Sequence, residues 1–344
     1  MRTSEQVTPG HPDKLCDAIA DTILDHYLAQ DPDARVAVEV LAHRSEIILA
    51  GEVTSTERQD HSQITRQVLA DIGYSEVWWP GFNEVEVRDR IAPQSPNLNT
   101  QIGEGAGDQG IVYGYATNAT RELLPPEYVA ATKVARHLYE QHLEFPDWLG
   151  PDGKATATVN EAGELEKITC SALHRTPLAD TRRRLGESIR EALNFDGPIT
   201  VNPAGDFTVG GPSADTGLTG RKIIADSYGG RGRHGGGAFS GKDPSKVDRT
   251  GAYHARQLAV EYLERNPGVS EVDVQLGWAI GGMTPLSIEI EADSRRVTPQ
   301  GLVWQESPAQ IADRLGLRTP AHRHQSAFGH FADTTKPWNQ PRIG

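Results

Sequence analysis

A stretch rich in glycine and in positive charge lies between residues 220 and 256. Its cations are Arg221, Lys222, Arg231, Arg233, Lys242, Lys246, Arg249 and Arg256. Glycine lets backbone N–H groups approach a ligand closely, and lysine and arginine neutralise negative charge, so this composition suits a polyphosphate. Asp243 and Asp248 are spaced to hold a metal ion that shares the same phosphates. A basic surface loop without a ligand is the alternative interpretation.

The segment from Gly236 to Lys242 has the spacing of a P-loop. However, Asp243 follows it, where a P-loop has the Ser or Thr that binds Mg²⁺. No apolar strand leads directly into the segment either. A P-loop nucleotide hydrolase is therefore disfavoured.

The whole chain is acidic, although this stretch is basic. Its 344 residues carry a formal net charge of -13, which argues against nucleic acid as a general partner. With 37% hydrophobic residues and no long apolar run, we expect a globular protein of two or three domains, without membrane contact. The N-terminus has no leader-like apolar core, and Cys16 and Cys170 are too few for a disulfide framework. Both features predict a cytoplasmic protein.

Hydrophobic periodicity and turn residues predict helices and strands throughout the chain. The expected helices start at Pro12 and span 56–72 with Thr56 as cap, 125–142, 180–193, 249–264 and 308–315. The expected strands span 35–41, 46–53, 84–91, 111–116, 155–159, 166–173, 272–278 and 286–291. Each third of the chain thus mixes strands and helices, which predicts an α+β fold of similar units with ranges 1–100, 101–210 and 211–344.

Several polar residues fall at the ends or on the faces of these elements. His11 and Asp13 lie at the start of the first helix, where free N–H groups favour anions, although Asp13 also suits a helix cap. The turn-like residues 149–154 predict that Lys154 lies at the end of a sheet. Glu39 and Glu52 fall within strands, where a carboxylate usually faces solvent.

The chemistry that these residues suggest is charge neutralisation at a leaving group. Lysine, arginine and Mg²⁺ lower the barrier to displacement of a polyphosphate without any proton transfer. A neutral thioether sulfur would need no general base, which fits a chain without an evident Ser-His-Asp or Cys-His pair. Composition alone does not choose the nucleophile.

Five motifs give the chain a specific resemblance. They are Gly-His-Pro-Asp-Lys at 10–14, Gly-Ala-Gly-Asp-Gln-Gly at 105–110, Gly-Leu-Thr-Gly-Arg-Lys at 217–222, His-Gly-Gly-Gly-Ala-Phe-Ser-Gly-Lys-Asp-Pro-Ser-Lys-Val-Asp at 234–248 and Gly-His-Phe at 329–331. In this order, from end to end, they resemble the methionine adenosyltransferase (S-adenosylmethionine synthetase) family.

The resemblance implies a reaction and an architecture. The family joins the sulfur of L-methionine to C5′ of ATP, and it cleaves the tripolyphosphate released to pyrophosphate and phosphate. It uses two Mg²⁺ ions and a K⁺ ion per site. Its fold has three similar α+β domains around a pseudo-threefold axis, and two chains build each site, as a homodimer or a dimer of dimers.

The resemblance also implies roles for individual residues. His11, Lys154, Lys242 and Lys246 match catalytic positions. ATP and phosphate positions are matched by His11, Asp108, Asp152, Lys154, Asp215, Arg221, Lys222, Ala238 and Lys242, and Arg231 and His234 are further phosphate candidates. Methionine positions are matched by Glu52, Gln94, Asp215 and Lys246. Asp13 and Asp248 match the Mg²⁺ ligands, and Glu39 matches the K⁺ site.

The chain departs from the family pattern at three places. The connection from Gln94 to Gly105, which covers the site in the family, is several residues shorter than in typical bacterial members, so we expect altered gating or substrate range. Asp206 stands where a cation usually contacts the nucleotide. Residues 295–328 resemble the family poorly.

Two other functions compete with the transferase. A polyphosphate hydrolase would keep the phosphate and metal residues but lose methionine transfer, which the presence of Glu52, Gln94 and Lys246 opposes. A catalytically silent subunit that assembles with an active partner is opposed by His11, Asp13, Lys154 and Lys242.

Overall fold

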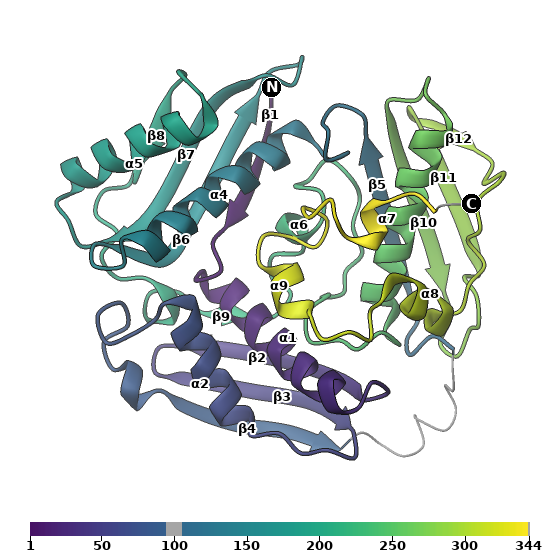
Figure 1. Ribbon diagram of the computed structural model, residues 1–344, viewed down its shortest axis with the longest axis horizontal. Coiled ribbons are helices and arrows are strands. Elements are labelled where there is room, and N and C mark those ends of the chain that lie inside the picture. The colour runs from purple at the N-terminus through teal and green to yellow at the C-terminus, as the bar shows by residue number, and fades with distance from the viewer. Residues whose placement is uncertain (94–104, 343–344) are drawn as a thin grey trace.

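The computed structural model describes residues 1–93 and 105–342. It is an α+β fold in which three units surround a common centre, each with one four-stranded sheet (Figure 1). Each unit repeats one order of elements: a long helix, an antiparallel pair of strands, and then a shorter helix. The three long helices have 19 residues each. The predicted α+β class and threefold arrangement are therefore confirmed.

The first unit contains α1 (Pro12–Gln30), β2 (Arg35–His43), β3 (Glu46–Thr54), α2 (His61–Ile72) and β4 (Glu86–Pro93). β2 and β3 pair antiparallel, and β4 returns parallel to β3. α1 and α2 cover one face of this sheet, where the alternating apolar residues of β2 and β3 are buried.

The second unit contains α4 (Pro126–Glu144), β6 (Leu149–Val159), β7 (Leu165–His174), α5 (Leu178–Leu193) and β8 (Ile199–Val201). Its strand pairing is the same as in the first unit: β6 and β7 are antiparallel, and β8 is parallel to β7. α4 and α5 pack on it around the buried Val134, Leu138, Leu185 and Ile189.

The third unit contains α7 (Val247–Arg265), β10 (Glu271–Trp278), β11 (Ser287–Ala292), β12 (Arg295–Val297) and α8 (Pro308–Leu315). It differs in one respect, because its last strand, β12, follows β11 directly and pairs with it antiparallel. α7 is buried along most of its length between this sheet and the centre of the molecule.

The fourth strand of each sheet comes from a different part of the chain. β1 (Arg2–Val7) pairs with β6, β5 (Gly110–Thr117) pairs with β10, and β9 (Gly217–Leu218) pairs with β2. Each of these strands precedes the long helix of one unit but completes the sheet of the next. The three units thus exchange strands in a closed cycle, and the sheets do not follow the three expected sequence ranges.

Two short helices complete the centre of the molecule. α6 (Ile223–Asp226) follows β9, and α9 (His322–Ser326) packs against α1 near the C-terminus (Figure 1). Both thiols, Cys16 and Cys170, are free and buried. In the described ranges no helix combines the length and the apolar character that crossing a bilayer requires.

Two local predictions were wrong. The second helix begins at His61 and not near Thr56, because the side chain of Asp60 accepts a hydrogen bond from the Gln63 N–H at 2.9 Å and caps the helix there. Residues 149–154 are not a turn, because β6 already begins at Leu149. Lys154 therefore lies inside β6, opposite Val7 and Ser171, rather than at its end.

Candidate functional site

The first helical turn of α1 gathers one group of the expected site residues. His11 is the N-cap of α1: its Nδ1 accepts a hydrogen bond from the Asp13 N–H at 3.2 Å. Because Nδ1 is the acceptor, the proton of the neutral imidazole lies on Nε2, which is left as a donor. The alternative role of Asp13 as a cap is wrong, because its carboxylate turns toward another segment.

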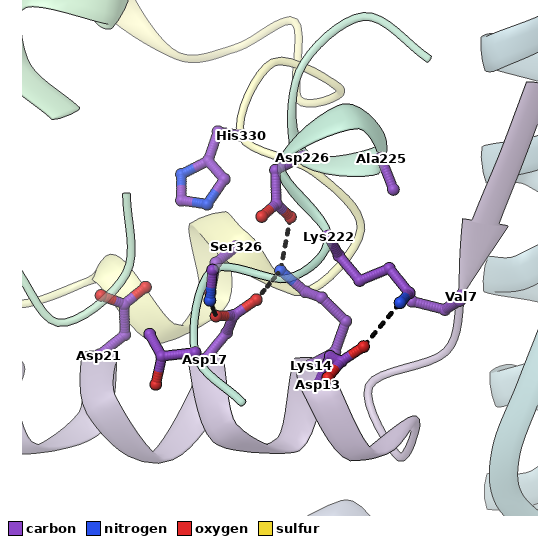
Figure 2. A network of polar contacts seen from close by, with 12 residues as sticks. Val7, Asp13, Lys14, Asp17, Asp21, Lys222, Ala225, Asp226, Ser326 and His330 are labelled. Atoms are coloured by element: carbon purple, nitrogen blue, oxygen red, sulfur yellow. Dashed lines mark hydrogen bonds and ion pairs between the residues drawn. The ribbon is translucent and has the colours of Figure 1, made fainter. Parts of the chain in front are cut away.

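Asp13 is buried and joins α1 to the segment after β9. Its Oδ1 accepts from the Leu218 N–H at 3.0 Å, and its Oδ2 lies 2.6 Å from Nζ of Lys222. Arg221 approaches the same carboxylate, with its Nε 3.7 Å from Oδ1. Figure 2 shows Lys222 and Asp13 meeting above the start of α1. One carboxylate thus holds two cations that the sequence assigns to phosphate.

His11 is neutral at physiological pH. Its pKa is lowered to about 3, chiefly by burial and also by the neighbouring charges of Lys222 and Lys154, against an opposing effect of Asp13. A neutral imidazole among cations can donate a hydrogen bond from Nε2 without adding to their repulsion. It therefore suits an oxygen-rich ligand that the surrounding lysines already attract.

Asp152, Lys154 and Asp215 surround this group. Asp152 is buried and its Oδ2 accepts from the Gly211 N–H at 2.8 Å, while burial raises its pKa to about 7. Asp215 is exposed and contributes to that raised pKa. Lys154 reaches out from β6 to Glu5 of the neighbouring strand β1, with Nζ 2.5 Å from Oε2.

A second group lies where the glycine-rich stretch passes the start of α7. Nζ of Lys242 lies 2.6 Å from Oδ2 of Asp248. Backbone approaches closely here, because a Cβ at Gly237 would lie 2.2 Å from the Asp248 carboxylate, so glycine is required at that position. Gly110, which begins β5, adjoins the same carboxylate.

Asp243 has a structural role instead of the metal role considered for it. It is buried, with Oδ1 accepting from the Ser245 N–H at 2.8 Å and Oδ2 from the Val36 N–H at 2.7 Å, and it pairs with Lys246. Both oxygens are therefore occupied. The contact fixes the segment after Gly241 to the edge of β2.

The remaining predicted site residues are more dispersed. Glu39 and Glu52 lie on the outward face of the first sheet. Burial raises the pKa of Glu39, and the nearby charge of Lys242 opposes that rise. Asp108 is exposed just before β5, and Ala238 packs against Gly220. Gln94 lies outside the described residues.

Arg231 and His234 have partners away from the phosphate candidates. Arg231 pairs with Glu271 at 2.8 Å, and Nδ1 of His234 contacts the Gly235 carbonyl oxygen at 2.7 Å. Within the described ranges, neither residue forms a hydrogen bond or ion pair with Asp13, Lys242 or Asp248.

The site residues thus form two groups in one chain. The α1 group contains His11, Asp13, Asp152, Lys154, Asp215, Arg221 and Lys222. The α7 group contains Asp108, Ala238, Lys242 and Asp248. Within residues 1–93 and 105–342, no hydrogen bond or ion pair links a member of one group to a member of the other.

Neither group is a closed metal cage. No cluster of three or more His, Cys, Asp or Glu side chains is placed to hold a metal ion in the part of the chain that the structure describes. Each group instead offers one carboxylate, Asp13 or Asp248, beside a lysine. This donor set fits Mg²⁺, which is commonly held by one or two carboxylates together with substrate phosphates.

Sequence reasoning missed a set of buried charges behind the α1 group. Lys14, Asp17, Asp21 and Asp226 are all buried, and they connect α1 to α6 and α7. The spacing of Asp13, Asp17, Asp21 and Asp25 is a signal that was available, since residues four apart share one helix face. The helix itself was predicted from hydrophobic periodicity, which does not mark these charged residues.

Comparison with known proteins covers the whole chain. Residues 1–96 match the model for the N-terminal domain of S-adenosylmethionine synthetase, 103–207 the central domain and 209–340 the C-terminal domain. The S-adenosylmethionine synthase of Brachyspira hyodysenteriae is 39% identical over 366 residues, covering 96% of this chain and 92% of the relative. That of Nocardia farcinica is 39% identical over 383 residues, covering 98% and 94% respectively.

Proposed function

The chain belongs to the S-adenosylmethionine synthetase family and is a methionine adenosyltransferase, and we propose that its two groups of charged residues form the site of that reaction. The methionine sulfur attacks C5′ of ATP, the S–C bond forms, and the bond from C5′ to the triphosphate oxygen breaks. The electron pair leaves on the triphosphate, and the product sulfonium keeps a positive charge. The tripolyphosphate is then hydrolysed to pyrophosphate and phosphate.

The observation that carries this proposal is how the site cations are held. Lys222 lies on Asp13, Lys242 on Asp248, and Lys154 on Glu5, each at 2.5–2.6 Å. Charges held in place before the ligand arrives are the arrangement that stabilises a leaving group most, because no reorganisation is needed as negative charge develops. No general base is required, since a thioether sulfur carries no proton.

His11 would assist at the reacting carbon. Its neutral imidazole donates from Nε2, and burial, together with the lysines around it, keeps it neutral, so it can contact oxygen without becoming a proton source. Mg²⁺ would be held by Asp13 and Asp248 and would neutralise triphosphate charge when bound. In each pair, the metal would then be the new partner of the carboxylate, and the phosphate would be the new partner of the lysine. Each charged side chain would thus keep an opposite charge beside it.

We also propose that two copies of the chain complete each site. The α1 group of one copy would face the α7 group of the other, which would supply the direct contact between the two groups that the described residues of one chain do not show. The outward face of the first sheet supports this, because Leu41 and Ile48 are only partly buried there beside Glu39 and Glu52. Partly exposed apolar side chains on such a face are compatible with a subunit interface.

The remaining roles follow the family resemblance. Glu52, Gln94, Asp215 and Lys246 would bind methionine, Asp108 and Ala238 would contact the nucleotide, and Glu39 would hold K⁺. The two buried free thiols support a reducing compartment such as the cytoplasm. None of these assignments is needed for the two charged groups to act on triphosphate.

The proposal is tested by turnover of the purified chain. ATP, L-methionine, Mg²⁺ and K⁺ are supplied, and S-adenosylmethionine and phosphate are followed together. We expect both products in equal amounts and only with methionine present, and a strong loss of both in His11→Ala. Phosphate without S-adenosylmethionine would favour the polyphosphate hydrolase, and neither product would favour the silent subunit.

A further inference from the structure

The carboxylates spaced four apart on α1 all accept backbone N–H groups from distant segments. The pairs are Asp13 with Leu218, Asp17 with Gly220, Asp21 with Gly241, and Asp25 with His322 and Arg323, at 2.9–3.0 Å. One face of α1 therefore fixes the backbone of the segments that carry the site cations. Hydrogen bonds to a carboxylate are stronger than those between neutral groups, so these are firm attachments.

Lys14 lies in the first turn of α1, next to Asp13, and its side chain is buried. Figure 2 shows its ammonium group between Asp17 and Asp226, which it contacts at 3.0 and 2.6 Å. Its side chain is 1% exposed. Burial lowers the pKa of Lys14, but the two carboxylates raise it by more, so the net pKa lies above its usual value and the group stays charged. A fully buried ammonium is tolerated only when it is paired in this way.

The place of Asp226 in the chain gives this contact its significance. Asp226 is the last residue of α6, a helix of four residues that begins directly after Arg221 and Lys222. Asp17 accepts a hydrogen bond from the Gly220 N–H just before these two cations, and Lys14 contacts Asp226 at the end of α6. Both ends of the short segment are thus attached to α1, one turn away from His11 and Asp13.

We propose that Lys14, together with Asp17 and Asp226, is a positioning element that sets Arg221 and Lys222 opposite His11 and Asp13. Lys14 does not touch the substrate in this account. It fixes the distance between the two sides of the phosphate site, which must be accurate because a shift of about 1 Å costs on the order of 100-fold in rate. The inference rests on the proposed function of Arg221 and Lys222.

The alternative is that the cluster only stabilises the fold. Removing one member of a buried ion pair is destabilising anywhere in a protein, so a loss of stability alone does not separate the two roles. A positioning role predicts an effect on phosphate binding and turnover that exceeds the effect of breaking a comparable ion pair elsewhere. The pair of Glu306 with Arg314, at 2.7 Å in the C-terminal part of the chain, provides a comparison that is only partly buried, and Glu306 also pairs with Arg342 there.

The test compares Asp226→Asn and Asp226→Glu with the matched control Glu306→Gln. For each full-length protein we measure the Kd for tripolyphosphate with Mg²⁺, kcat, KM for each substrate, and Tm at one protein concentration. We expect both Asp226 variants to weaken tripolyphosphate binding and to lower kcat/KM for ATP about tenfold. The KM for methionine and all constants of Glu306→Gln stay within about twofold.

Asp226→Glu separates position from charge, because it keeps the carboxylate but moves it along a longer side chain. It should lose turnover while its Tm falls less than that of Asp226→Asn, since the charge on the buried partner of Lys14 is kept, and it remains informative if Asp226→Asn fails to fold. Wild-type turnover and binding in both Asp226 variants, or equal losses in Glu306→Gln, would overturn the inference. A wild-type protein that binds tripolyphosphate but makes no S-adenosylmethionine would instead contradict the proposed function, and the Kd values would still decide this inference.

Discussion

Asp152→Asn tests the electrostatics of the α1 group through the stability of the protein. The Asp152 side chain is buried in β6, and its Oδ2 accepts from the Gly211 N–H, a hydrogen bond that an asparagine oxygen can also accept. Burial raises the pKa of Asp152 to about 7, with further contributions from Asp215 and Asp13. In the unfolded chain an aspartate has its ordinary pKa of about 3.9.

The sign of the effect follows from this difference. Between the two pKa values the folded protein binds a proton at Asp152 that the unfolded chain has lost, so stability falls as pH rises from about 4 to about 7 and levels off above that pH. For a single group with this pKa, the free energy of unfolding decreases by about 1 kcal/mol between pH 6 and pH 8. Asp152→Asn has no ionisable group at this position, so its free energy of unfolding lacks this part of the decrease between pH 6 and pH 8.

The assay is urea unfolding of wild type and variant at pH 6 and pH 8, at one protein concentration and without ligands. Other titrating groups are shared by the two proteins and cancel in the comparison. Wild type should lose about 1 kcal/mol more than Asp152→Asn across this interval. The exposed Asp206, substituted by asparagine, is the matched control and should behave as wild type. Identical pH dependence of wild type and Asp152→Asn would refute the reasoning.

Two further substitutions test single contacts of the site. Glu5→Gln removes the carboxylate 2.5 Å from Lys154, and we expect kcat to fall about threefold to tenfold while Tm stays within about 2 °C, since the pair is partly exposed to solvent. An unchanged kcat would contradict a role of Glu5 in placing Lys154. Asp206→Arg places a cation at an exposed position, and we expect a lower KM for ATP than in wild type. The difference in KM should become smaller at high salt, because salt screens exposed charges. A KM that does not fall would show that this position does not contact the nucleotide.

Apolar periodicity together with turn and capping residues predicted much of the fold. The helix over Pro308–Leu315 was placed with its exact bounds, and α7 within about two residues. β1 was not predicted, because the segment from Arg2 to Val7 is short and mostly polar. It becomes a strand only because β6 supplies its partner, which no local pattern reveals. The cyclic exchange of strands was invisible for the same reason.

The motifs named candidate site residues that the structure brings together, whereas the contacts that depend only on packing were not predicted. His11, Asp13 and Lys222 were named from sequence, and the structure brings them together. The buried cluster of Lys14 and Asp226 was missed, because these residues are 212 positions apart and nothing local marks them as partners. Their pairing depends on how α1 packs against α6 in the centre of the molecule.

The central claim is that each site combines the α1 group of one copy with the α7 group of another. His11→Ala disables the first group and Lys242→Met the second, so each variant alone should be inactive. Coexpression of both should give mixed dimers in which one of the two sites is intact, and S-adenosylmethionine formation should recover to about a quarter of wild type. No recovery, in preparations shown to contain the mixed dimer, would mean that one chain forms the whole site and would contradict this account.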